Sequence, residues 1–229
     1  MSKLNFISEL LRVSHMAKAT EKGLIVQKVG MTRVADANGV MTPVTLLKVT
    51  PQRITKILSV ERDGYTGFQV GYFEKSEKNL TKPDVHRLRK NKIEENFARF
   101  REFRTPTEVG GLEIGAEMTS QLFDGIVSVD ITGITKGRGF QGAVKRWGNA
   151  IGRMTHGSRH HRRPGSLGQN SSPSRVYKNK PQPGQMGTDR CTVQNLQVVR
   201  IDHEDNVIAI KGSVPGYNTN YLELRPTIK

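Results

Sequence analysis

The chain has 229 residues, of which 36 are Lys or Arg and 21 are Asp or Glu, so its formal net charge is +15. A polyanion binds such a chain by releasing its own counterions, which makes nucleic acid the first partner to consider. An anionic membrane is set aside, because no run of about twenty apolar residues and no basic helix with a matching apolar face occurs. The single cysteine, Cys191, excludes an internal disulfide and a multi-cysteine zinc site and is typical of a reducing compartment.

Residues 1–22 are expected to form a flexible N-terminal extension. They have no apolar core long enough for a secretory signal. Lys3, Arg12 and the amphipathic spacing leave an organellar transit peptide open. Translation that starts at Met16 is the alternative, so the role of this segment is left open.

The first third of the chain predicts short strands joined by close turns. Residues 23–39 form an apolar, β-branched run that ends in Asp-Ala-Asn-Gly, the composition of a tight turn. Residues 42–58 alternate apolar with polar side chains around Pro51, which predicts two strands. A further strand is expected at residues 68–73. This texture is typical of a small antiparallel sheet or barrel.

Residues 82–104 differ in texture and predict a small helical insertion. They are rich in Lys, Arg and Glu, and Pro83 and Asp84 suit a helix N-terminus. Apolar residues then follow at loosely helical spacing. One or two short surface helices are therefore expected near residues 82–104.

The strand-like pattern returns in the second half. Residues 126–134 predict one strand, and residues 192–201 and 207–213 flank a cluster of turn residues that predicts a hairpin. Neither β-rich half has enough strands to bury its own face. Residues 23–134 and 188–229 are therefore expected to close one barrel domain.

Between the two halves lies a segment of unusual charge. Residues 131–188 contain no Asp or Glu but hold 11 Lys and Arg, 11 Gly and three of the six His. In the rest of the chain, 25 basic residues face 21 acidic ones. The excess charge is therefore local, and residues 135–187 are interpreted as a basic, glycine-rich extension.

The composition of this extension suits a folded RNA. Glycine lets the backbone approach phosphates, Arg and Lys neutralise them, and Phe140, Trp147 and Tyr177 offer faces on which unpaired bases stack. For Trp147, burial in a core is an equally good interpretation. The candidate RNA-binding residues are Lys136, Arg138, Phe140, Lys145, Arg146, Trp147, Arg153, His156, Arg159, His160, His161, Arg162, Arg163, Gln169, Asn170, Arg175, Lys178 and Lys180.

Burial alone cannot order such a segment, so disorder in the free protein is expected. Because predicted strands anchor both ends, we expect a long two-stranded or irregular loop that becomes ordered inside RNA.

No catalytic, metal or cofactor site is predicted. His156, His160 and His161 lie among arginines whose charge repels a cation. GRGFQG at residues 137–142 lacks the Lys-Ser or Lys-Thr ending of a P-loop. A nucleic-acid-modifying enzyme or translation factor would need a catalytic or nucleotide-binding set, and a DNA-compacting protein would not need the β-rich scaffold. No small-molecule substrate is expected either.

Several motifs occur in order along the chain: KVGMTR, VDITGITKGRGFQGAVKRW, RRPGSLGQN, GQMG and KGSVPG. They resemble the third large-subunit ribosomal protein family in its bacterial form, from about Gly23 to the C-terminus. The resemblance implies a mainly β fold with some α, namely a six-stranded, translation-factor-like β-barrel with a small helical insertion and a long basic loop. It also implies a cytoplasmic ribosomal location, with an organellar ribosome less favoured.

The family resemblance further implies a structural, non-enzymatic role. The protein would bind large-subunit rRNA directly beside neighbouring large-subunit proteins, nucleate early assembly and extend its loop toward the peptidyl transferase centre. By position in the motif, residues 168–172 would lie near the tip of the loop, with Asn170 among those closest to the catalytic RNA. Some bacterial relatives carry a methylated glutamine where this chain has Ser171, so that modification is not expected.

Overall fold

The computed structural model describes residues 22–35, 39–106 and 111–228. The expected N-terminal extension and most of the turn that follows Ala35 lie outside this range. The described residues belong to two compact units, Met1–Gly133 with Cys191–Lys229, and Ile134–Arg190.

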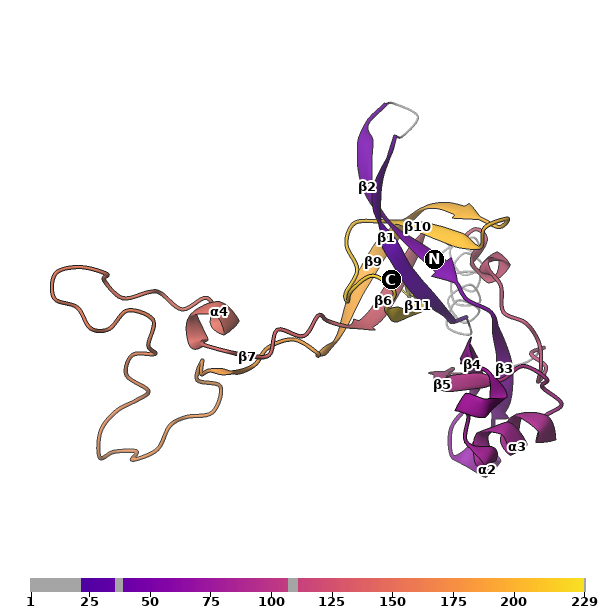
Figure 1. Ribbon diagram of the computed structural model, residues 1–229, viewed down its shortest axis with the longest axis horizontal. Helices are drawn as coiled ribbons and strands as arrows, with labels where there is room; N and C mark the ends of the chain where they lie inside the picture. Colours follow the sequence, from indigo (N-terminus) through magenta and orange to yellow (C-terminus); the bar gives the residue numbers. More distant parts are fainter. Residues whose placement is uncertain (1–21, 36–38, 107–110, 229) are drawn as a thin grey trace, which may run out of the picture. The chain divides into compact units, whose positions relative to one another are not determined.

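Six strands of the first unit form one sheet in the order β1-β11-β6-β9-β10-β2. Strand β2 pairs antiparallel with β1, so the sheet closes into a barrel (Figure 1). The prediction of a mainly β chain with few helices is confirmed. The strands are β1 (Leu24–Ala35), β2 (Met41–Val49), β6 (Ser128–Ile134), β9 (Arg190–Asp202), β10 (Val207–Lys211) and β11 (Tyr221–Pro226).

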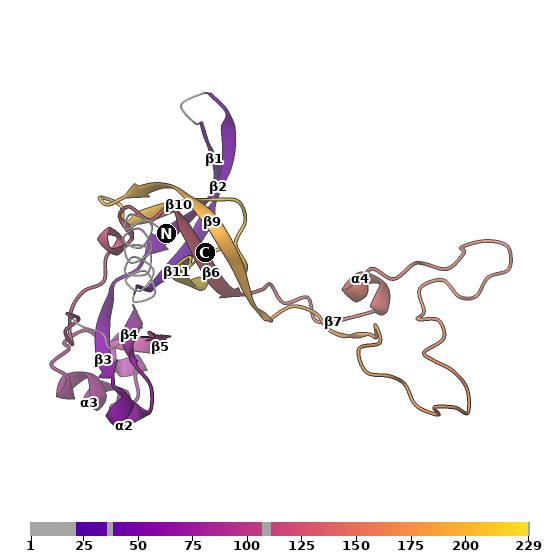
Figure 2. The same ribbon diagram turned by 180° about the vertical axis from the view of Figure 1, so that it is seen from behind.

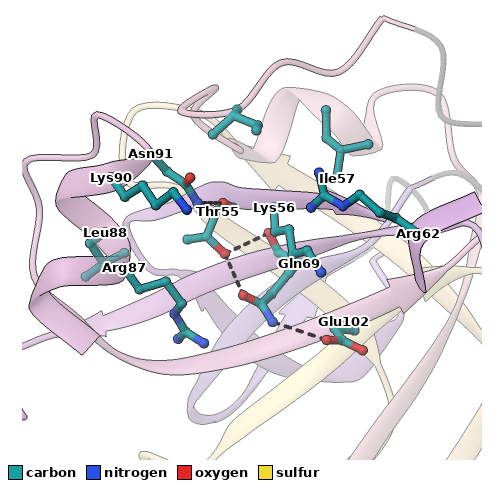
Figure 3. Close-up of a pocket in the computed structure, with 11 residues that line it drawn as sticks. Thr55, Lys56, Ile57, Arg62, Gln69, Arg87, Leu88, Lys90, Asn91 and Glu102 are labelled. Atoms are coloured by element: carbon teal, nitrogen blue, oxygen red, sulfur yellow. Dashed lines mark hydrogen bonds between the residues drawn. The ribbon is translucent and has the colours of Figure 1, made fainter. Parts of the chain in front are cut away.

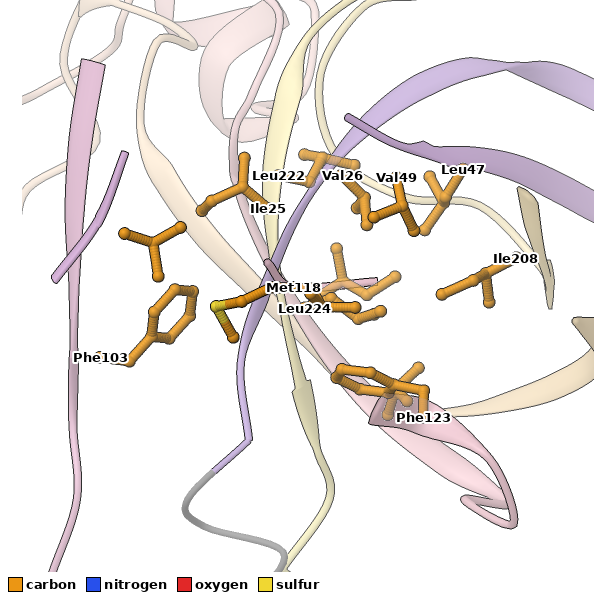
Figure 4. Packing of buried hydrophobic residues seen from close by; sticks show 14 of the residues in the cluster. Ile25, Val26, Leu47, Val49, Phe103, Met118, Phe123, Ile208, Leu222 and Leu224 are labelled. Carbon is orange, nitrogen blue, oxygen red and sulfur yellow. The ribbon is translucent and has the colours of Figure 1, made fainter. Parts of the chain in front are cut away.

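The barrel strands bury alternate side chains, as expected for strands with one face on a core. In β11, Leu222 and Leu224 are buried, and in β6 Val129 and Ile131 are buried. Val129 and Ile131 belong to the same buried cluster as Leu222 and Leu224, and Figure 4 shows the latter two beside side chains of β1, β2 and β10. The labelled residues there are Ile25, Val26, Leu47, Val49, Phe103, Met118, Phe123, Ile208, Leu222 and Leu224.

A second, three-stranded antiparallel sheet has the order β3-β4-β5. Phe68 and Phe103 stack with ring centroids 5.4 Å apart and belong to the same buried cluster as the barrel interior. The range 23–134, expected to belong to one barrel domain, thus also holds a second sheet whose strands are not part of the barrel. The strands are β3 (Gln52–Leu58), β4 (Gly67–Glu74) and β5 (Phe97–Arg104).

Short helices lie against the end of this second sheet that is remote from the barrel (Figure 2). They are α2 (Val60–Asp63) and α3 (Lys82–Lys90), and 3-10 turns occur at η1 (Glu77–Asn79) and η2 (Ser120–Phe123). The predicted start of α3 is confirmed, because Pro83 occupies its first turn.

The expected helical character of residues 91–104 was wrong, because β5 occupies most of that range. Phe97, Phe100 and Phe103 are spaced by three, which imitates a helix. In the structure Phe97 and Phe103 are buried, and β5 pairs with β4 from Arg104 to Phe97. Pairing with a strand distant in sequence overrides the local pattern.

The side chain of Gln52 joins the second sheet to the barrel. Gln52 is 1% exposed, its Nε2 donates to the Ile25 carbonyl oxygen at 2.9 Å, and its Oε1 accepts from the Ile25 N–H at 2.9 Å. A side-chain amide thus replaces a strand partner for Ile25, so both buried backbone groups are satisfied.

Both predicted hairpins are confirmed. Ala35 pairs with Met41 at the end of the β1–β2 ladder, and Asp202 pairs with Val207 in β9–β10. Pro51 lies in the break between β2 and β3, as predicted.

The second unit contains little regular structure (Figure 1). Strands β7 (Phe140–Gln141) and β8 (Gly184–Gln185) pair antiparallel, and a short helix α4 (Ala143–Trp147) follows β7. Irregular backbone connects α4 to β8.

Candidate nucleic-acid interface

The second unit, Ile134–Arg190, is named the basic arm, and its two ends are paired as a stem. Thr135 donates its N–H to the Asp189 carbonyl oxygen at 2.9 Å, and the backbone N–H of Arg138 donates to the Met186 carbonyl oxygen at 2.9 Å. Met186 in turn donates to Gly139 at 2.9 Å, next to the β7–β8 pair. These bonds hold the base of the loop, so the loop does not depend on burial to keep its ends together.

Helix α4 is clamped to the returning chain at one carbonyl oxygen. Trp147 Nε1 donates to the Gln182 carbonyl oxygen at 2.9 Å, and Arg146 Nη1 donates to the same oxygen at 3.1 Å. The Arg146 guanidinium lies 5.1 Å from the centre of the Trp147 ring. Two donors on one acceptor fix the direction in which the loop leaves the stem.

The structure shows whether Trp147 is part of a buried core. Its side chain is 54% exposed, and it belongs to neither buried cluster found among the described residues. Trp147 is therefore not a core residue here. Its polar edge is used for the clamp, while part of its ring stays open.

The arm presents its cations without compensating anions. All eleven Lys and Arg side chains of residues 136–180 are exposed except that of Arg146, which is half-buried. Within the described ranges, no carboxylate forms an ion pair with any of them. An exposed cation without a carboxylate neighbour keeps its full attraction for phosphate.

Two further aromatic rings of the arm are open to solvent. Phe140 is 75% exposed, and Tyr177 is 46% exposed with the Arg175 guanidinium 5.3 Å from its ring centre. Exposed rings and guanidinium planes are surfaces on which unpaired bases stack.

The three histidines do not form a metal centre. His161 Nδ1 lies 3.0 Å from the Arg153 carbonyl oxygen, and Gly152 donates its N–H to the His161 carbonyl oxygen at 2.8 Å. Across the residues that the structure describes, no group of three or more His, Cys, Asp and Glu is arranged to hold a metal ion.

All the candidate RNA-binding residues lie on the arm, and only Arg146 and His161 among them are half-buried. Gln169 and Asn170 are both exposed near Ser166, whose hydroxyl donates to the Gly168 carbonyl oxygen at 2.9 Å. Sequence reasoning missed the role of Gln182, because it acts through its backbone. The flanking prolines of PQPG were the only available signal.

A Ser-His-Asp chain occurs outside the arm. His203 Nδ1 lies 3.0 Å from Ser120 Oγ, and His203 Nε2 lies 3.1 Å from Asp124 Oδ1. The Ser120 hydroxyl donates to Asn206 Oδ1 at 3.2 Å, and Ser120 is 1% exposed. Because the Ser120 hydroxyl is buried, it cannot contact a substrate. These hydrogen bonds instead connect η2 to the β9–β10 turn.

No helix in the described part of the chain is long and apolar enough to cross a membrane.

Comparison with known proteins defines the class of this chain. The family described as "Ribosomal protein L3" matches residues 113–209, a range that includes the entire basic arm. The "Large ribosomal subunit protein uL3" of Alkaliphilus metalliredigens is 45% identical over 208 residues, which cover 91% of this chain and 98% of the relative.

The proteins of the same name from Streptococcus pyogenes and Shewanella sp. strain ANA-3 are 44% and 43% identical, over 91% and 90% of this chain and 98% of each relative. These likenesses define a structural ribosomal protein and not an enzyme. The chain belongs to the ribosomal protein L3 family, which confirms the resemblance found in its motifs.

Proposed function

We propose that this protein is a structural constituent of the large ribosomal subunit that binds large-subunit rRNA directly through the basic arm. The observation that carries the proposal is the set of eleven Lys and Arg side chains that have no ion-pair partner among the described residues. Residues 131–188 hold no carboxylate at all, so every charge of this stretch attracts phosphate. The names of the relatives support the large-subunit assignment.

The stem and the irregular loop of the arm have different roles in this proposal. The stem and the Gln182 clamp set the root of the loop, and the irregular backbone beyond α4 adapts to the RNA surface. Adaptation of this kind is typical of basic segments that gain order on binding RNA. Residues 168–172 are proposed as the tip, and there the amides of Gln169 and Asn170 offer hydrogen bonds without adding charge.

The proposal includes the role that family resemblance implies. The barrel is of the translation-factor type, the loop extends toward the peptidyl transferase centre, and binding nucleates early assembly beside neighbouring large-subunit proteins. The location is the cytoplasmic ribosome. No cofactor is involved.

The test is sucrose-gradient fractionation of cells that express the tagged full-length chain, followed by mass spectrometry of each fraction. The proposal predicts the protein in large subunits, whole ribosomes and early large-subunit precursors. Recovery only in light, ribosome-free fractions would overturn it.

A further inference from the structure

A cavity in the first unit has the chemistry of a second ligand site. Its volume is about 490 Å³, within the range of small-ligand pockets. The cavity lies between the face of the β3-β4-β5 sheet and helix α3 (Figure 3). Its lining is Thr55, Lys56, Ile57, Arg62, Gln69, Arg87, Leu88, Lys90, Asn91, Glu102 and Ile114.

The floor of the cavity is a continuous chain of hydrogen bonds. Thr55 Oγ1 donates to Gln69 Oε1 at 3.0 Å, and Gln69 Nε2 donates to Glu102 Oε1 at 3.1 Å. Tyr65 donates its hydroxyl to Glu102 Oε2 at 2.7 Å. Each carboxylate oxygen of Glu102 therefore accepts one bond and keeps a second lone pair for a ligand.

A bulge in β3 positions this floor. The register with β4 shifts between Ile54 and Lys56, which leaves Thr55 as the extra residue. Asn91 Nδ2 donates to the Thr55 carbonyl oxygen at 2.7 Å and so ties the end of α3 to the bulge. Bulges re-aim side chains and are common beside binding sites.

The cavity carries more positive than negative charge. Lys56 is paired with Asp63 at 2.5 Å, and Arg87 lies 3.7 Å from Asp84. Arg62 and Lys90, on opposite sides of the cavity in Figure 3, have no ion-pair partner in the ranges that the structure describes. These two cations are free to hold an anionic group.

We propose that this cavity binds one unpaired guanosine nucleotide of RNA, with its phosphate held by Arg62 or Lys90 and the Watson–Crick edge of its base on Glu102. Ile57, Leu88 and Ile114 provide apolar contact for the base. The adjacent N1–H and N2–H donors of guanine match a carboxylate, whereas adenine presents an acceptor there. A bare phosphate or an acidic peptide would leave these apolar side chains and the Gln69–Glu102 edge unused.

The inference rests on the proposed RNA-binding function but does not involve the arm. Unpaired bases that are splayed out of the helix are the usual targets of sequence-specific RNA recognition. The cavity would thus add a base-specific contact to the charge-driven contacts of the arm.

The test is NMR titration of the full-length, isotope-labelled chain with guanosine 5′-monophosphate, adenosine 5′-monophosphate, inorganic phosphate and a glutamate-rich peptide. The inference predicts that guanosine monophosphate shifts the side-chain amide signals of Gln69 and Asn91 and gives NOEs from its base to the methyl groups of Ile57 and Leu88. Adenosine monophosphate and phosphate should bind at least several-fold more weakly. Equal binding of phosphate or peptide, or no change at Gln69 and Asn91, would overturn it.

Variants add a second readout. Replacing both Arg62 and Lys90 with Ala should weaken guanosine monophosphate binding about tenfold or more, and Glu102→Gln should abolish the preference over adenosine monophosphate. The charge-matched control replaces Arg33 and Lys78 with Ala, both exposed and outside the cavity, and should change nothing. Thermal unfolding identifies any variant that has lost its fold, and the NOEs in the unmodified chain do not depend on variants.

The two proposals fail separately. If the Arg62 and Lys90 variant binds the nucleotide normally while the full chain still enters large subunits, only the guanosine site is wrong. If the chain is absent from ribosomes but the cavity still selects guanosine monophosphate, only the proposed ribosomal function is wrong.

Discussion

The buried Gln52 side chain forms hydrogen bonds with both the N–H and the carbonyl oxygen of Ile25, as the backbone of a neighbouring strand would. Gln52→Ala leaves the Ile25 N–H and carbonyl oxygen without these partners, and each unsatisfied buried group costs about 1–3 kcal/mol. We expect the free energy of unfolding, measured with urea, to fall by about 2–4 kcal/mol. The control is Gln27→Ala, whose exposed amide donates to the Thr219 carbonyl oxygen at 3.2 Å. If Gln52→Ala is as stable as this control, Gln52 does not stabilise the connection between the second sheet and the barrel.

Gly187 lies at a point of close approach within the arm's stem. Its φ is +78°, and a Cβ there would come within 2.0 Å of the Lys136 carbonyl oxygen. Gly187→Ala should therefore open the stem and speed amide hydrogen exchange at Arg138 and Met186. Gly139→Ala is the matched control, because Gly139 also has positive φ (+67°) but nothing lies within 4 Å of its added Cβ. Equal rates of amide hydrogen exchange in the two variants would show that the strain of positive φ, and not the contact with the Lys136 carbonyl oxygen, opens the stem.

Asp63 gives the first unit an acid-sensitive contact. The hydrogen bond from Lys56, at 2.5 Å, holds the pKa of Asp63 below its ordinary value of 3.8. Since the folded pKa is the lower one, the contribution to stability is present above pH 3.8 and is lost as pH falls through the folded pKa. The difference in Tm between the unmodified chain and Asp63→Asn should shrink over that interval. A difference that is constant between pH 2 and about pH 6 would contradict this assignment.

At the scale of elements, local patterns predicted hairpins well and sheet membership poorly. The turn composition after Ala35 and after Ile201 marked both hairpins, because turn residues act locally. The separation of β3, β4 and β5 into their own sheet depends on long-range partners such as Gln52 with Ile25. No local pattern carries that information, so the sequence did not distinguish these three strands from the strands of the barrel.

The arm was the most predictable part in charge and the least predictable in geometry. The absence of carboxylates from residues 131–188 follows directly from the sequence. The clamp at Gln182 does not, because a backbone carbonyl has no signature in sequence. Trp147 shows the difference clearly, since its type allowed either core or stacking and only the structure revealed its bond to Gln182.

Deleting residues 153–180 removes the irregular loop and leaves the stem and clamp residues in place. The buried clusters lie entirely outside this segment, so the Tm of the first unit should stay within a few degrees of the unmodified value. Large-subunit assembly or peptide-bond formation should be impaired when the shortened chain is the only copy in the cell. Normal subunit profiles and normal translation would refute the role of the loop.

For the whole molecule, the distribution of charge matters more than its total. Residues 131–188 contribute 11 of the 15 net positive charges, and the rest of the chain is close to balanced. Association with RNA should therefore depend on salt through the arm. If roughly six to ten side chains meet phosphates, affinity falls about a thousandfold to a hundred-thousandfold between ~50 and ~200 mM salt.

The most direct test compares the salt dependence of rRNA binding for three full-length proteins. One is unmodified, one has six arm cations replaced by Gln, and one has six exposed cations of the first unit replaced by Gln. The arm set is Arg153, Arg159, Arg162, Arg163, Arg175 and Lys178, and the control set is Arg33, Lys48, Lys75, Lys78, Lys92 and Lys211.

Each lost phosphate contact lowers the slope of log affinity against log salt by about 0.7–0.9. We predict that the arm variant loses a slope of about 4–5 and that the control variant loses little. Equal slopes for the unmodified protein and the arm variant would contradict the claim that the basic arm is the rRNA-binding element.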